Sequence, residues 1–167
     1  MPVWKSIVLG LVMALAATAG AAAQSWSEYQ PASGRYVIEM PGMPKVERLP
    51  VTNNDGSKTD LVQASVELPE AYYMVSYLDY GPNLDAYKTL ATIKARYAAM
   101  GTMHSKRPPY PGQPGFEVTV DRHDGIYINA RVLIVASRLY QMVVTSHSAD
   151  YRSDTQHFFN SFKPLSP

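Results

Sequence analysis

Apolar and polar side chains alternate with a period of two along much of this chain, and this pattern predicts strands with one buried face. The clearest case is Leu61–Leu68, in which every second residue from Val62 onward is apolar. Alternating or mostly apolar runs also predict strands over residues 26–29, 35–40, 46–52, 71–80, 116–120, 126–136 and 138–146. Residues 71–80 are apolar on both faces, which predicts a central strand packed on both sides. Pro50 favours an edge position for the strand over residues 46–52, because proline cannot donate to a sheet ladder.

A helical period follows the strand over residues 71–80. Apolar residues then recur at steps of three and four, and they form one stripe that would lie on the sheet: Ala86, Leu90, Ile93, Tyr97 and Met100. We expect Asn83 to cap the first turn and Gly101 to end the helix. A second, shorter helix is predicted over residues 150–162, with three Phe side chains on the core. The Pro-rich residues 102–114 are expected to form a loop.

Tight turns connect several of the predicted strands, notably at Asp124-Gly125 and near Ser137. Strands joined in this way pair antiparallel, and helices inserted between runs of strands make an α+β domain. We therefore predict one antiparallel sheet of about seven or eight strands, covered by one long helix and one short C-terminal helix.

Gly34–Pro44 is an aromatic-Val strand that runs into Pro-Gly-x-Pro, and Phe158–Lys163 has an aromatic residue followed after two residues by Ser-Phe. These two segments resemble small secreted bacterial proteins with a PsbP-like fold. The strand pair around Gly125 and Leu139-Tyr140 is similar to theirs. The resemblance implies an antiparallel sheet sandwiched by helices, and export from the cytoplasm. It implies no catalytic residue.

The first 23 residues have the three parts of a secretory signal peptide. Lys5 gives a positive start, Ile7–Ala17 is mostly apolar, and Ala21 and Ala23 provide small side chains before a cleavage site. An uncleaved anchor is the alternative, but Ile7–Ala23 is at the short limit for a membrane span. We expect cleavage after Ala23, a single α+β domain over residues 24–167 without a transmembrane anchor, and a periplasmic or extracellular location.

Composition narrows the chemistry that this chain can perform. The chain has no cysteine, which excludes disulfides, thiol catalysis and thiolate metal sites. It has 15 Lys and Arg against 14 Asp and Glu, and Lys5 would leave with the signal peptide. A near-zero balance without a basic cluster argues against nucleic-acid binding.

Three binding or catalytic hypotheses follow, and no cofactor is expected in any of them. The leading one is a non-enzymatic module that binds a protein or another envelope component, with Arg107 and Tyr110 of the loop Ser105–Gln113 as contact residues. The second is a carrier that holds a small apolar ligand between the sheet and the helix face around Tyr97. The third is a hydrolase that uses His147, although the Gly-x-Ser-x-Gly elbow is missing.

The four histidines show no close pairing of the kind that metal sites use. His147 and His157, with Asp150 and Asp154, could meet only across the terminal turn. We therefore expect no metal site.

N-terminal sequencing of the protein recovered from its native host should begin at Gln24, because the small residues at Ala21 and Ala23 suit signal peptidase. A protein that still carried Met1–Ala23 would contradict the predicted export and trimming.

Overall fold

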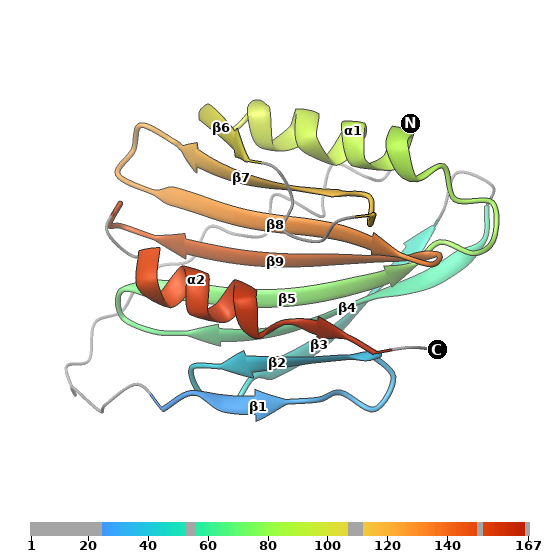
Figure 1. The fold of residues 1–167 in the computed structure, drawn as a ribbon, viewed down its shortest axis with the longest axis horizontal. Coiled ribbons are helices and arrows are strands. Elements are labelled where there is room, and N and C mark those ends of the chain that lie inside the picture. The colour runs from blue at the N-terminus through green and yellow to red at the C-terminus, as the bar shows by residue number, and fades with distance from the viewer. Residues whose placement is uncertain (1–24, 53–55, 107–111, 150–151, 166–167) are drawn as a thin grey trace.

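The computed structural model describes residues 25–52, 56–106, 112–149 and 152–165, which form ten strands and two helices. Seven strands make one antiparallel sheet in the order β3-β4-β5-β9-β8-β7-β6 (Figure 1). Their bounds are Lys45–Thr52 (β3), Lys58–Glu67 (β4), Ala71–Asp79 (β5), Thr102–Lys106 (β6), Gly115–Asp121 (β7), Tyr127–Val135 (β8) and Arg138–Ser146 (β9). The predicted α+β class and the antiparallel sheet are thus confirmed.

A second, three-stranded sheet lies beside the first, in the order β1-β2-β10. Its strands are Ser27–Tyr29 (β1), Tyr36–Met40 (β2) and Lys163–Pro164 (β10). The expectation of a single main sheet was therefore wrong for the first two predicted strands. Alternation reports which face of a strand is buried, but it does not identify the strand's partners. Among the described strands β2 pairs with β1 and β10, and it turns its apolar face toward the large sheet.

Two helices lie on the sheets, α1 over Ala86–Ala98 and α2 over Arg152–Ser161. In Figure 1, α1 runs along the β6–β7 side of the large sheet, and α2 lies near β9 and β2. The N-cap of α1 is Asp85 rather than the expected Asn83, because the Asp85 Oδ1 accepts the Lys88 N–H at 3.0 Å. The helix ends at Ala98, with Ala99 as its C-cap rather than Gly101.

The segment after α1 also departs from the sequence prediction. Residues 102–106 form strand β6 at the edge of the large sheet, where a loop was expected. Most of β6 is exposed, and only Met103 packs partly against the core, so the segment has no apolar alternation to reveal it. At the opposite edge, β3 contains Pro50, as the edge prediction requires.

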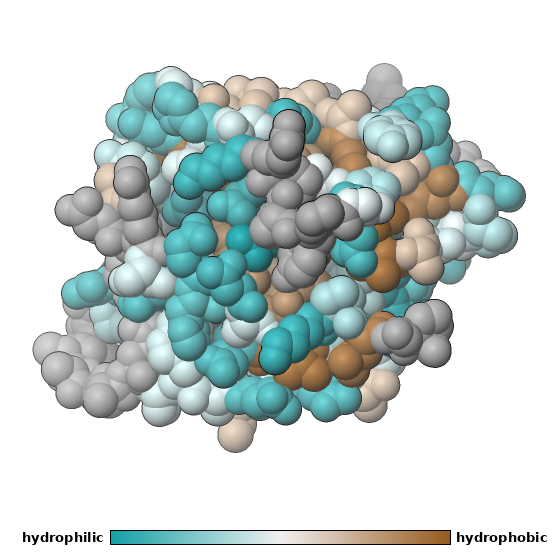
Figure 2. All heavy atoms as spheres, viewed as in Figure 1, coloured by the Kyte–Doolittle hydropathy of each residue, from teal (hydrophilic) through white to brown (hydrophobic). Residues whose placement is uncertain are grey.

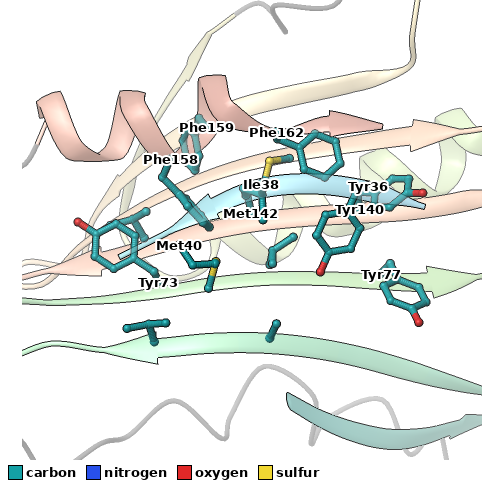
Figure 3. Close-up of a cluster of buried hydrophobic side chains, with 14 of the residues drawn as sticks. Tyr36, Ile38, Met40, Tyr73, Tyr77, Tyr140, Met142, Phe158, Phe159 and Phe162 are labelled. Atoms are coloured by element: carbon teal, nitrogen blue, oxygen red, sulfur yellow. The ribbon is translucent and has the colours of Figure 1, made fainter. Parts of the chain in front are cut away.

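The large sheet is apolar on both faces. One face packs against β2 and α2, and Figure 3 shows aromatic and aliphatic side chains from these elements converging over β5 and β9. This cluster includes Tyr36, Ile38, Met40, Tyr73, Tyr77, Tyr140, Met142, Phe158, Phe159 and Phe162. The other face packs against α1 through Leu90, Ile93 and Tyr97. The central position predicted for residues 71–80 is confirmed, since β5 contributes to both clusters.

Polar side chains cover much of the face that carries α2 and the small sheet. In Figure 2, hydrophilic residues dominate the left and centre of this face, and smaller apolar patches lie toward the right and the lower edge. The aromatic cluster of Figure 3 is therefore enclosed below a largely polar surface.

Two buried arginines hold α2 and the small sheet on this face of the large sheet. Arg131 of β8 donates to the Glu117 carboxylate at 2.9 and 3.0 Å and to the Phe159 carbonyl near the end of α2 at 2.8 Å. Arg138 of β9 pairs with Asp79 and donates to the backbone carbonyls of Ser33 and Gly34, just before β2. Each guanidinium thus links the large sheet to an element that covers it.

Replacing Arg131 with Met should lower the free energy of unfolding by about 3–5 kcal/mol, because the Glu117 carboxylate would stay buried without its partner. Adding Glu117→Leu in the same chain should restore much of this loss, since no unpaired charge then remains. Urea unfolding at neutral pH measures both effects. Lys45→Met, which removes an exposed ion pair with Glu47, serves as the control and should leave the midpoint almost unchanged. Equal stability of Arg131→Met and the unmodified protein would contradict this role.

Candidate functional site: a groove beside helix α1

An open groove of about 450 Å³ runs between α1 and the start of β7. One wall comes from the helix and the other from the segment that leads into the strand. Its lining residues are Tyr87, Leu90, Ala91, Lys94, Gly112, Gln113, Pro114, Gly115 and Phe116. The volume falls in the range of small-molecule pockets, but the groove opens to solvent and does not enclose its contents.

The helix wall follows from helical spacing. Leu90 and Ala91 follow Tyr87 by three and four residues, and Lys94 follows Ala91 by three. All four residues therefore share one side of α1. Leu90 is buried at the edge of the stripe that packs on the sheet, whereas Tyr87 is 80% exposed. The groove therefore begins where the core-facing side of α1 meets its solvent-facing side.

The opposite wall depends on two features of the sheet edge. First, β6 is described up to Lys106, which pairs with Glu117, and Gly115 and Phe116 are the first two residues of β7. Second, Gly115 lies tight against β8, where an added Cβ would collide with the Val132 carbonyl oxygen. The Ile134 N–H also donates to the Pro114 carbonyl at 2.9 Å, which fixes the segment on β8.

The chemistry of the groove combines an apolar floor with a few polar groups. Phe116 and Leu90 are buried and form the floor, together with Pro114. Among the described lining residues Lys94 alone is charged, and it is half-buried. The Gln113 Oε1 is enclosed without a hydrogen-bond donor among the residues that the structure describes. Such a surface suits a ligand or partner that combines an apolar group with hydrogen-bond donors or negative charge.

Tyr97 belongs to the core and does not line the groove. Its ring packs edge-on against Phe116 with centroids 6.3 Å apart, and its hydroxyl donates a long hydrogen bond of 3.5 Å to Gln141. Burial raises the pKa of the Tyr97 hydroxyl well above its ordinary value. Tyr97 is therefore a core residue that packs between α1 and the sheet.

The other sequence-predicted contact residues, Arg107 and Tyr110, lie outside the described residues. The groove includes Gly112 and Gln113, which follow Tyr110 closely in the chain. The prediction for Arg107 and Tyr110 therefore stays open, while the last two residues of the predicted contact loop Ser105–Gln113 line the groove.

His147 is exposed directly after β9. The preceding Ser146 hydroxyl donates to the Ser148 carbonyl at 3.0 Å and so belongs to a turn. In the described part of the chain no hydroxyl or carboxylate is hydrogen-bonded to the His147 imidazole, and Asp150 lies outside that part.

The remaining histidines have separate surroundings. His157 contacts the Glu39 carboxylate of β2, and its ring packs against Trp26. His123 contacts Thr102 at 2.9 Å in the β7–β8 turn. No group of three or more potential metal ligands occurs among the residues with assigned positions.

Neither family models nor curated proteins nor solved structures yield a match to this chain. Within the described ranges, neither helix has the length and apolar character needed to cross a bilayer.

Sequence reasoning missed the groove residues Tyr87 and Lys94 because they lie off the apolar stripe of α1. An exposed aromatic residue one turn before a buried Leu was the available signal. Gln113 ends the loop Ser105–Gln113 that the sequence predicted as a contact surface, but its place in a groove wall depends on the fold.

Replacing Tyr97 with Phe should make the alkaline loss of stability shallower. The pKa of Tyr97 is raised in the folded protein and is about 10 in the unfolded chain. The contribution of Tyr97 to the free energy of unfolding is therefore full below about pH 10 and falls as the pH rises. Each such tyrosine adds about 1.4 kcal/mol per pH unit to the slope of unfolding free energy above that pH. Denaturant unfolding over an alkaline pH series measures it.

The control is Ile93→Val, which should lower stability by about 1 kcal/mol at every pH and leave the slope unchanged. A Tyr97→Phe protein with an unaltered alkaline slope would contradict the assignment of Tyr97 as a buried, neutral core residue.

Proposed function

We propose that this chain is a non-enzymatic binding module that acts in the periplasm or outside the cell, and that the groove beside α1 is its contact surface. The observation that carries the proposal is the open apolar floor of Leu90 and Phe116, bordered by the exposed ring of Tyr87 and by Lys94. Exposed aromatic side chains next to a cation are typical anchors of protein interfaces. The signal-like residues 1–23 support the proposed location.

The openness of the groove favours a protein or envelope component over a carried small molecule. A carrier encloses most of its ligand's surface, because an apolar ligand left in water gains little from binding. The carrier hypothesis placed its ligand near Tyr97, whose ring packs against Phe116 in the core. The groove instead offers a surface that a larger partner can cover.

We also propose that the chain shares the PsbP-like plan that Gly34–Pro44 and Phe158–Lys163 resemble. Support comes from the antiparallel sheet with one helix on each face and from the burial of Tyr36, Phe158 and Phe162 in the core. The resembling segments thus serve the fold. This part of the proposal concerns architecture and adds no ligand.

A photo-crosslinking amino acid at position 91, introduced into the full chain in its native host, should give a covalent adduct with a partner because Ala91 lines the groove. The same amino acid at position 95 is the matched control, since Ala95 is also exposed on α1 but lies outside the lining. Denaturing gels and mass spectrometry detect the adduct. Equal or absent adducts at the two positions would contradict the groove as the contact surface.

A further inference from the structure

The charges on α1 restrict the kind of partner that the groove accepts, if the proposed function is correct. Between Ala86 and Ala98 the helix carries Lys88, Lys94 and Arg96 and no acidic residue. Asp85 precedes the helix, and its carboxylate accepts the Lys88 backbone N–H as the N-cap. Of these three residues Lys94 lies in the groove lining, and the helix between Ala86 and Ala98 adds no acidic side chain to that lining.

Lys94 is the residue that brings this charge into the groove. It is half-buried, and it makes no ion pair or hydrogen bond with the residues that the structure describes. A partner that excludes water from the groove would strengthen a pair between Lys94 and a carboxylate, because water then screens the pair less. Among the described residues, Lys94 is thus a cation beside the apolar floor with no anionic partner.

The openness of the groove favours a protein segment over a fatty acid. The groove does not enclose its contents, so a fatty acid bound there would keep much of its chain in water. A partner protein covers such a surface from outside and excludes water from it.

The geometry points to a protein segment in which an apolar side chain on Leu90 and Phe116 lies close in sequence to an aspartate or glutamate at Lys94. This inference rests on the proposed function and specifies its partner: an acidic, partly apolar segment of another protein in the same compartment.

Arrays of short synthetic peptides test this preference with the full chain as the soluble probe. Each peptide carries one Leu or Phe, followed two positions later by Asp, Asn or Lys, in a Gly/Ser background. At low salt the protein should be retained about tenfold more strongly by Asp peptides than by Asn peptides, the ratio that corresponds to about 1.4 kcal/mol. Lys peptides should be retained least, and added salt should reduce the ratio.

Two matched variants assign the preference to Lys94. Lys94→Met should bring the Asp and Asn signals together, whereas Lys88→Met removes a charge of the same helix outside the lining and should keep the difference. Circular dichroism confirms that both variants retain the fold. Ala91→Trp should block retention of all peptides, and Ala95→Trp, which adds the same ring outside the groove, should not.

Several results would overturn the inference. These are equal retention of Asp and Asn peptides, a preference that survives Lys94→Met, and no retention of any peptide. Tighter retention of a fluorescent fatty acid than of every acidic peptide, lost in Ala91→Trp, would overturn the choice of a protein segment. If Asp and Asn peptides bind equally and Ala91→Trp abolishes both, the acidic partner is wrong but the groove remains a contact surface. If position 91 also gives no adduct in the native host, the proposed function fails as well.

Discussion

The fold depends on one constraint, which is that the central strands β5 and β9 are apolar on both faces. Tyr73 and Val75 face one side of the large sheet, and Leu78 and Val143 face the other. Each square ångström of such surface left in water would cost about 25 cal/mol, so neither face can remain uncovered. Because the chain has no disulfide to hold a cover in place, both layers must be held by packing and polar contacts. Helix α1 covers one face, and α2 with the small sheet covers the other.

The cover on the α2 side poses the harder assembly problem, because it combines segments from both ends of the described chain. Strand β2 pairs with β10, so the residues after α2 close the small sheet that the first strands begin. Apolar packing alone is non-directional and would not fix their orientation. Hydrogen bonds fix this orientation. Arg131 holds the last turn of α2, and Arg138 holds the turn before β2. The Ser161 hydroxyl accepts the Glu39 N–H at 2.9 Å.

The features of the fold that could be predicted from the sequence are those whose physical signal lies within one segment of the chain. The central place of residues 71–80 and the edge place of residues 46–52 could be predicted, because burial on two faces and Pro50 each act within one strand. The separate sheet of β1 and β2 could not, since alternation does not name a partner. Strand β6 lacked alternation because it is an exposed edge. The groove was missed because its two walls meet only in the folded chain. Tyr97 was placed correctly on the core-facing stripe, and it is buried between α1 and the sheet.

The groove and the core make different demands on the residues that form them. Leu90 and Phe116 serve both the core and the groove. They are buried between α1 and the sheet, and they also line the groove. Tyr87 and Lys94 border the opening, and neither belongs to the buried core. Packing of the core does not require the ring of Tyr87, which is 80% exposed. It also does not require the ammonium group of Lys94, which has no acidic neighbour among the described lining residues. Since exposed positions such as Tyr87 can usually change at little cost in stability, their chemistry can be set by what the protein binds. A groove whose floor serves the fold and whose rim is free to vary can acquire a partner without weakening the domain that presents it.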